Sequence, residues 1–306
     1  MPTPSGREDA ALSREHPPAN HLLLHFSDTH FVADGLLYGG VDGRERLDQL
    51  LTAIGRSGVR PDALVFTGDL TDTGDPEAYS SLRDVVEPFA EQLDAPVIWL
   101  MGNHDKRAAL RSALLGEPPE EAPLYRSYRL GGLRVIALDT SVPGHHHGEL
   151  DDAQLAWLEA ELSRPAPEGS ILALHHPPIP MVQDLAVLTE LRRQDRLAEI
   201  VQGKDIRLVL AGHVHFPSSS LFAGIPVSVA SSTCYTQDLN VPVGGIRGMD
   251  GAQGFNLVHV YPHTIVTSFA TLGSFATVGE YVPPEEVRRR LMAAGADLAS
   301  GSRPRR

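Results

Sequence analysis

The sequence predicts an α/β layered fold, and three observations support this prediction. Apolar segments with the length of buried strands alternate along the chain with segments of helical hydrophobic spacing. Hydrophobic residues make up 42% of the chain, which is ordinary for a globular protein. Five of the predicted strands end in clusters of polar residues. Because ligands of α/β sheets bind beyond the carboxyl ends of the strands, we expect the functional site where these clusters meet.

The predicted strands are short apolar runs, several of which end in a carboxylate or an imidazole. They span 21–28, 62–69, 95–105, 125–130, 133–139, 169–178 and 205–215, and β-hairpins are expected over 217–231 and 255–270. The predicted helices carry apolar residues three and four positions apart, and one begins with an Asp-Pro pair, a good start for a helix. They span 41–58, 75–93, 151–163 and 189–202.

Three parts of the chain differ in composition. Residues 1–20 are polar, contain proline and lack periodicity, which predicts a disordered N-terminal arm. Residues 21–278 form one core domain without a dividing linker, and 279–306 form a short helix and a tail. The arginines at 288–290 indicate a solvated helix face, with an anionic membrane surface or a partner as the alternative contact.

Charge and cysteine content exclude several classes of protein. The net charge of −13 argues against a protein that binds long nucleic acids through their phosphates. The single cysteine, Cys234, rules out an internal disulfide and a site of several thiolates, and it fits a reducing compartment. The chain shows neither an apolar run of membrane-spanning length nor a signal sequence, so we expect a cytoplasmic protein without a transmembrane segment.

The five polar clusters are SDTH, GDLTD, GNHD, HHPP and GHVH, and each follows a predicted strand. A single Asp or His at a strand end is usually a turn or cap residue. Five such clusters in one topological position instead indicate a site. Carboxylates and imidazoles gathered without Lys or Arg repel one another or stay unpaired when buried, and bound cations compensate for this.

The clusters supply seven candidate metal ligands, which exceed the roughly four ligands of a structural zinc site. They suit two metal ions if one carboxylate bridges. Mixed oxygen and nitrogen donors suit iron, manganese or zinc, and paired ions about 3.5–4 Å apart serve phosphoester displacement. The seven candidates are Asp28, His30, Asp69, Asn103, His175, His213 and His215.

The ordered motifs D-x-H, G-D-x-x-D, G-N-H-D, H-H and G-H-x-H resemble those of the calcineurin-like metallophosphoesterase superfamily over residues 21 to 215. The runs LDTSVPGHHHGEL and ALHHPPIP are similar to its bacterial class III cyclic-nucleotide phosphodiesterase branch. The resemblance implies a four-layer α/β/β/α sandwich and a homodimer. It also implies an enzyme that hydrolyses 3′,5′-cyclic nucleotides, cAMP and also cGMP, to 5′-nucleotides by attack of a metal-bound hydroxide.

The resemblance also assigns the ligands. The first ion, usually iron, would be held by Asp28, His30, Asp69 and His215. The second, usually manganese, with zinc or another divalent ion as the alternative, would be held by Asp69, Asn103, His175 and His213. Asp69 would bridge the two ions.

Two further residues of these motifs are expected to act without binding a metal ion. His104 would point toward the phosphate, where it could stabilise charge or protonate the leaving oxygen. Asp72 would orient His104, with a simple turn residue as the alternative.

Three other features are weaker candidates. His176 is expected to support the site from behind the ligands. Cys234 and Tyr235 line the substrate mouth or a dimer contact, with a packed loop as the alternative. The histidines at 145–147 are expected on a surface or rim loop that contacts substrate or a second subunit.

Departures from other branches narrow the function. Thr73 stands where protein phosphatases have an arginine that grips a monoester, and Asp72 stands where purple acid phosphatases have a tyrosine. Two alternatives to the cyclic-nucleotide enzyme remain. One is a broad phosphodiesterase acting on 2′,3′-cyclic nucleotides or cell-envelope phosphodiesters. The other is a non-catalytic scaffold of the same fold, which the complete ligand set disfavours.

Overall fold

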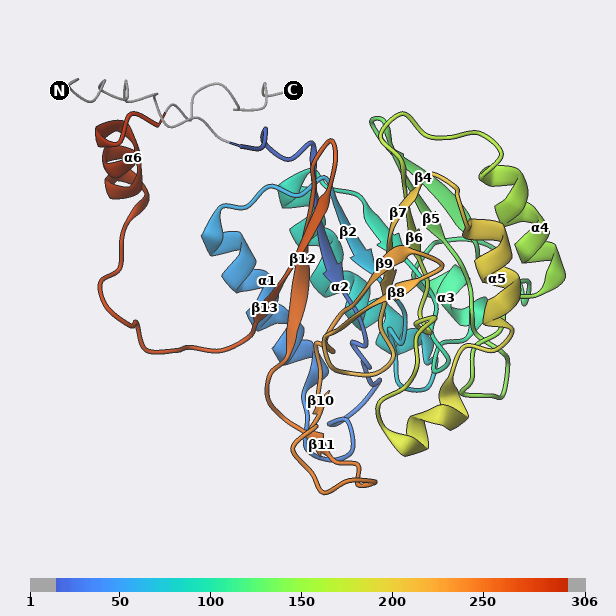
Figure 1. Ribbon diagram of the computed structural model, residues 1–306. Helices are drawn as coiled ribbons and strands as arrows, with labels where there is room; N and C mark the ends of the chain where they lie inside the picture. The colour runs from blue at the N-terminus through green and yellow to red at the C-terminus, as the bar shows by residue number, and fades with distance from the viewer. Residues whose placement is uncertain (1–14, 297–306) are drawn as a thin grey trace.

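The computed structural model describes residues 15–296, and Figure 1 shows its helices and strands. The strands are β1 (His21–Phe26), β2 (Ala63–Phe66), β3 (Val97–Trp99), β4 (Arg126–Leu130), β5 (Leu133–Ala137), β6 (Ser170–Ala173), β7 (Ile206–Ala211), β8 (Ser218–Phe222), β9 (Ile225–Val229), β10 (Thr236–Gln237), β11 (Gly248–Met249), β12 (Gly254–Val260) and β13 (Ile265–Thr271). The helices are α1 (Gly43–Ser57), α2 (Pro76–Leu93), α3 (Arg107–Ala113), α4 (Asp152–Glu161), the 3-10 helix η1 (Asp184–Thr189), α5 (Gln194–Val201) and α6 (Pro284–Ala293).

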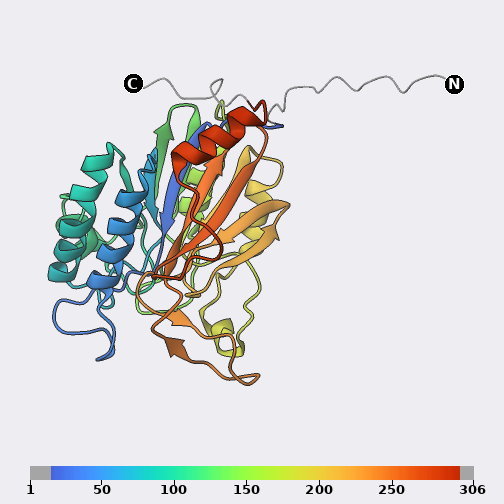
Figure 2. The same cartoon turned by 90° about the vertical axis from the view of Figure 1, so that its left-hand side faces the viewer.

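Two sheets pack face to face and are flanked by helices, which confirms the four-layer α/β/β/α sandwich. The first sheet has the strand order β13-β12-β1-β2-β3, and the second has the order β4-β5-β6-β7-β9-β8. Apolar side chains such as Leu23, Val135 and Leu208 fill the space between the sheets. Helices α1, α2 and α3 cover the outer face of the first sheet, and α4 and α5 cover that of the second (Figures 1 and 2).

The central strands run parallel in both sheets, and this arrangement sets the position of the site. β1 pairs in parallel with β2 and β2 with β3, while β5, β6, β7 and β9 pair in parallel in the second sheet. β1, β2, β6 and β7 are buried along nearly their whole length, which explains their continuous apolar runs. Their carboxyl ends therefore meet along one edge of the sandwich.

Local signals in the sequence explain the helix boundaries on the first sheet. The Asp42 side chain accepts the N–H of Glu45 at the start of α1, and Gly58 ends that helix in a left-handed conformation. The Asp75 side chain accepts the N–H of Glu77 at the start of α2, ahead of Pro76. The predicted helices 41–58 and 75–93 are thus confirmed.

Two helices differ from the sequence-based expectation. α3 was not expected, because seven residues are too few to show a helical period. The helix expected over 189–202 begins only at Gln194, since Thr189 ends η1 and residues 190–193 are not helical. Leu191 is buried and bridges to Gly148, which holds the intervening chain extended.

The two chain ends are described only in part. Residues 1–14 of the expected arm and residues 297–306 of the expected tail lie outside the described residues. Residue Asn20 already joins the fold, because its N–H donates to the Val260 carbonyl at 2.7 Å. α6 has no buried residue and lies apart from the sandwich at the end of an irregular connection (Figure 1). Among residues 15–296, no helix combines the length and apolar character needed to cross a membrane.

Candidate metal centre

The structure brings the seven candidate ligands together at the carboxyl edge of the two sheets. The first sheet contributes the oxygen donors and one imidazole, from the segments after β1, β2 and β3. The second sheet contributes three imidazoles, from the segments after β6 and β7. The first set is Asp28, His30, Asp69 and Asn103, and the second is His175, His213 and His215.

Three of these residues form a first cluster with ligand-like spacing. The Nε2 atoms of His30 and His215 lie 3.2 Å apart, and His215 Nε2 lies 3.4 Å from Asp28 Oδ1. Ligand atoms about 2.1 Å from one ion stand about 3.0–3.4 Å apart. All three side chains are at least 95% buried. The cluster therefore fits a single metal ion.

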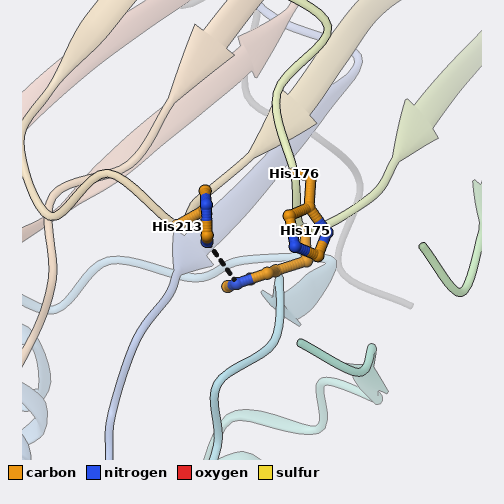
Figure 3. Close-up of side chains that lie close together, drawn as sticks. All are labelled: His175, His176 and His213. Atoms are coloured by element: carbon orange, nitrogen blue, oxygen red, sulfur yellow. Dashed lines mark hydrogen bonds between the residues drawn. The ribbon is translucent and has the colours of Figure 1, made fainter. Parts of the chain in front are cut away.

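A second cluster lies beside the first and shares a carboxylate with it. His175 Nε2 lies 3.2 Å from His213 Nδ1 (Figure 3) and 3.3 Å from Asp69 Oδ2. The same oxygen, Asp69 Oδ2, lies 3.6 Å from His30 Nε2 in the first cluster. Asn103 Oδ1 is buried beside them without a hydrogen-bond partner. The arrangement fits a second ion, with Asp69 positioned between the two.

The remaining ring nitrogen of each candidate histidine contacts an oxygen, as is usual for metal-binding histidines. These contacts orient each ring and leave the other nitrogen facing the cluster. The contacts are His30 Nδ1 to Asp72 Oδ1 at 3.2 Å, His175 Nδ1 to the Thr67 carbonyl at 2.7 Å, His213 Nε2 to the Thr189 carbonyl at 3.0 Å and His215 Nδ1 to the Tyr235 carbonyl at 2.9 Å.

Five of the seven candidate ligands have a left-handed backbone. This conformation is uncommon outside glycine and costs free energy, and such strain concentrates at functional sites. It turns the side chains of the strand ends toward the common centre. The residues are Asp28 (φ 53°), His30 (φ 42°), Asp69 (φ 48°), His213 (φ 77°) and His215 (φ 60°).

Two motif glycines allow this close approach of the loops. A Cβ atom at Gly212 would overlap Ser27 Oγ, and one at Gly102 would overlap the Asp69 carboxylate. Any larger residue at either position would push two ligand-bearing segments apart. The glycines in GNHD and GHVH are therefore required by packing.

The electrostatics of the centre also fit cations. Among the described residues, Asp28 and Asp69 form ion pairs only with histidines. Burial lowers the pKa of His213 to about 3 and that of His215 to about 4, which keeps both imidazoles neutral, the form that binds metals. Burial also acts on His175, but the charge and hydrogen bond of Asp69 outweigh it and raise the His175 pKa to about 9. The negative charges of Asp28 and Asp69 therefore favour a positive charge at the centre, either a protonated histidine or a bound cation.

His104 lies at the mouth of the centre with one nitrogen engaged. Its Nδ1 donates to the backbone carbonyl of Asp72 at 2.8 Å, which leaves Nε2 for a ligand. The Asp72 carboxylate lies farther from that nitrogen, at 3.6 Å, and nearer to His30 Nδ1, at 3.2 Å. Asp72 thus contacts His104 through its backbone carbonyl oxygen and His30 through its carboxylate oxygen Oδ1.

His176 approaches the second cluster, but both its ring nitrogens are engaged elsewhere. Nδ1 lies 2.7 Å from Thr140 Oγ1, and Nε2 lies 3.1 Å from the His146 carbonyl. His146 in turn places its Nδ1 3.1 Å from Asn103 Nδ2, and its ring 5.5 Å from that of His104. The sequence placed the His145–His147 loop only at the rim, whereas the structure brings His146 directly to the ligands.

Asp105 is a supporting residue that the sequence did not single out. Its carboxylate accepts the N–H groups of Leu70 (3.1 Å) and Gly102 (2.9 Å) and the hydroxyl of Tyr79 (2.9 Å). It therefore joins the loop that carries Asp69 to the loop that carries Asn103. Burial and the neighbouring Asp69 raise the Asp105 pKa to about 6. Its position as the last residue of the GNHD motif could have indicated this supporting role.

A cavity of about 200 Å³ opens above the centre. Five of the seven candidate ligands line it, all except Asp28 and His175, together with His104, His146 and residues of two further segments, 183–189 and 235–246. Tyr235 lines this cavity, whereas Cys234 is fully buried outside it. A larger groove of about 680 Å³ lies between α4 and α5, but its walls carry surface ion pairs such as Arg193–Asp152.

Comparison with known proteins identifies a family and several relatives of this chain. The sequence model of a family described as calcineurin-like phosphoesterase matches residues 21–217. A probable cyclic nucleotide phosphodiesterase of Rhodococcus erythropolis is 62% identical over 283 residues, which cover 92% of this chain and 94% of the relative. A cAMP/cGMP dual specificity phosphodiesterase of Mycobacterium tuberculosis is 58% identical over 282 residues, covering 92% and 89%.

Solved structures share the fold. A dimetal phosphatase of Danio rerio superposes with a TM-score of 0.57 at 14% identity, and the match covers 81% of this chain and 98% of that one. At this low identity the likeness concerns the fold alone.

Proposed function

The chain belongs to the calcineurin-like phosphoesterase family, and we propose that it is a phosphodiesterase with two metal ions that hydrolyses 3′,5′-cyclic nucleotides to 5′-nucleotides. The observation that carries this proposal is the pair of ligand clusters joined by Asp69 beneath an open cavity. The relatives at 62% and 58% identity, whose names denote cyclic-nucleotide phosphodiesterases, support the substrate class.

The ligand sets follow from the two clusters. Asp28, His30, Asp69 and His215 would hold one ion, and Asp69, Asn103, His175 and His213 would hold the other. The mixed oxygen and nitrogen donors suit iron and manganese, with zinc as the alternative. When bound, such a pair polarises phosphoryl oxygens and lowers the pKa of a bound water.

His104 supplies a proton donor for the leaving oxygen, a role that the metal ligands do not fill. Attack and departure at phosphorus are roughly in line, so the leaving oxygen lies opposite the attacking one. His104 lines the cavity, and its Nδ1 is held by the Asp72 carbonyl. In the imidazolium form, whose Nδ1–H stays on the carbonyl, the Nε2–H is thus the group that can give a proton to the leaving ribose oxygen.

The cavity favours a diester over a monoester. None of its lining residues is a Lys or an Arg, so the second negative charge of a monoester has no side-chain cation to pair with. Thr73, beside Asp72, offers no such cation either. A diester with a single negative charge does not need one.

A comparison of substrates tests the function. We expect the purified protein, with two metal ions per chain by elemental analysis, to show a higher kcat/KM for 3′,5′-cAMP and 3′,5′-cGMP than for 2′,3′-cAMP. Bis-p-nitrophenyl phosphate reports basal diester cleavage. A preference for 2′,3′-cAMP would favour the broad phosphodiesterase, and no hydrolysis by metal-loaded protein would favour the scaffold.

We further propose that the protein is a homodimer. β13 is an edge strand of the first sheet, and it exposes Val266 (45%) and Phe269 (42%). Exposed edges with apolar residues are sites of association. Light scattering over a concentration series should give twice the chain mass of 33.1 kDa. A constant value of one chain mass would contradict the dimer.

We also propose a cytoplasmic location. The single cysteine, Cys234, is free and buried, which suits a reducing compartment. Cell fractionation should recover the protein with cytoplasmic markers. Recovery with the membrane or outside the cell would contradict this location.

A further inference from the structure

The outer wall of the cavity is built by two segments that the proposed chemistry does not use. One is η1 with the residue before it, and the other runs from Tyr235 through β10 into the loop before β11. The segments lie side by side, since a Cβ atom at Gly244 would lie 3.7 Å from Asp184 Oδ2. Leu185 and Ile246 line the cavity from these two segments, although they are 57% and 48% exposed. Exposed apolar side chains at the mouth of a polar site indicate that an apolar part of a ligand rests there.

The same wall holds a donor and an acceptor that lack partners. Gln183 Nε2 and Gln237 Oε1 are both buried and form no hydrogen bond. Both residues line the cavity. Buried polar groups are almost always paired, and leaving one unpaired costs free energy. A ligand that offers one acceptor and one donor would satisfy both.

Each glutamine is fixed relative to the metal centre by backbone contacts. The Gln183 carbonyl accepts the N–H of Ala186 at the start of η1, and Thr189 at the end of η1 contacts His213 Nε2 at 3.0 Å. The Gln237 N–H donates to the His215 carbonyl at 3.2 Å. Both amides are therefore attached to segments that touch a candidate metal ligand.

We propose that Gln183 and Gln237 bind the purine base of a cyclic nucleotide, with Leu185, Ile246 and Tyr235 against the faces of the base. This proposal rests on the proposed phosphodiesterase function, because it assumes that the phosphate lies at the metal centre. Enzymes that hold an unstacked base read its edge with hydrogen bonds and cover its faces with aromatic or apolar side chains.

The choice of glutamine suits a site that accepts both purines. Adenine offers the N6 amino group beside ring-nitrogen acceptors, whereas guanine offers the O6 acceptor. A glutamine amide carries both a donor and an acceptor, and a half-turn of the amide exchanges them. A carboxylate or an ammonium group could not adapt in this way. The site therefore recognises a purine without choosing strongly between adenine and guanine.

Gln183→Leu, Gln237→Leu and the double variant test this site, since leucine keeps the approximate size and removes the amide. We expect each single variant to lose about 3- to 10-fold in kcat/KM on 3′,5′-cAMP and 3′,5′-cGMP, and the double variant about 10- to 100-fold. These losses should exceed those on bis-p-nitrophenyl phosphate, which has no base, by at least about threefold. Asn240→Leu removes an exposed amide from the loop that follows β10 and is the matched control.

A binding measurement separates the base from the rest of the substrate. With bis-p-nitrophenyl phosphate as substrate, the wild type should be inhibited more strongly by 5′-AMP and 5′-GMP than by ribose 5-phosphate. In the double variant, the inhibition constants of the nucleotides should approach that of ribose 5-phosphate. Gln237→Glu keeps only acceptors. It should raise the preference for adenine, whose N6 amino group donates, over guanine, whose O6 accepts.

The outcomes distinguish this proposal from the function on which it rests. A wild type that cleaves bis-p-nitrophenyl phosphate but no cyclic nucleotide would refute the proposed function. A wild type that hydrolyses cyclic nucleotides, with glutamine variants that lose equally on all substrates or not at all, would refute the base site alone.

Discussion

The metal centre and the outer wall of its cavity differ in burial and in the elements that carry them. At the centre, Asp28 and His175 are fully buried, and each candidate histidine has an oxygen partner for its second nitrogen. In the outer wall, Leu188 is 68% exposed and Val243 fully exposed. The centre is built on strand ends that both sheets hold in place, whereas the wall is built on loops. We infer from this contrast that the strand ends hold the proposed metal chemistry, whereas the attached loops set the proposed choice of substrate.

The largest effect is expected from Asp69→Ala, which breaks the centre itself. Asp69 Oδ2 contacts histidines of both clusters, so the change removes a ligand from both ions. We expect the loss of both metals by elemental analysis and roughly a 10³-fold or greater loss of kcat/KM. Asp48→Ala, at an exposed position of α1, is the control. A variant that keeps two metal ions would contradict the bridging role.

His104→Ala should affect the reaction while leaving the centre filled. Without the proton donor, cleavage of 3′,5′-cAMP should fall about 10²–10⁴-fold. The loss on bis-p-nitrophenyl phosphate should be clearly smaller, because p-nitrophenolate leaves without a proton. Kinetics on both substrates, together with metal content, decide the point. Equal losses would leave His104 as a phosphate-binding residue only.

Substitutions of Asp72 test whether a residue that contacts a candidate ligand affects metal affinity. Its carboxylate contacts His30 Nδ1 at 3.2 Å, while its carbonyl holds His104 and survives any substitution. We therefore expect Asp72→Ala to lower metal affinity about 10- to 100-fold, measured by titration with a chelator. Asp72→Asn should be milder, since its amide oxygen can still accept from His30. If metal affinity stays unchanged and only cAMP cleavage falls, Asp72 acts through His104 instead.

The smallest effect is expected far from both regions, at Glu168. Its carboxylate contacts His21 Nε2 at 2.7 Å and accepts from Asn20 Nδ2 at 2.7 Å. The hydrogen bond with His21, followed by the charge of His21, lowers the pKa of Glu168 below its ordinary value. Because the folded-state pKa is lowered, this contribution to stability is present above about pH 4.3 and is lost as the pH falls through the folded-state pKa.

Urea unfolding checks this prediction. Glu168→Gln should lower the free energy of unfolding by about 1 kcal/mol or less at pH 7 and by less at pH 3. Its kcat/KM should match the wild type, because the residue lies away from the cavity. A loss of activity comparable to that of the glutamine variants would mean that this end of the sandwich is coupled to the site.

The sequence by itself predicted the candidate ligands of the centre because their positions follow from strand ends. Each candidate ligand stands two to four residues after the end of a strand, and parallel strands bring such positions to one edge. The resemblance added the four-layer arrangement. The helix at 107–113 escaped prediction because it is too short to show a period, and the start of α5 escaped because the burial of Leu191 outweighs local propensity.

Only the tertiary structure decided which atoms meet. The sequence could name Asp72 as a partner of His104, but not that its carbonyl holds His104 while its carboxylate contacts His30. It could not place His146 beside Asn103, or bring Gln183 and Gln237 to one cavity from segments far apart in the chain. A strand end is visible in the sequence by itself, as an apolar run followed by a cluster of polar residues. The position of a loop depends on long-range packing, which no local pattern encodes.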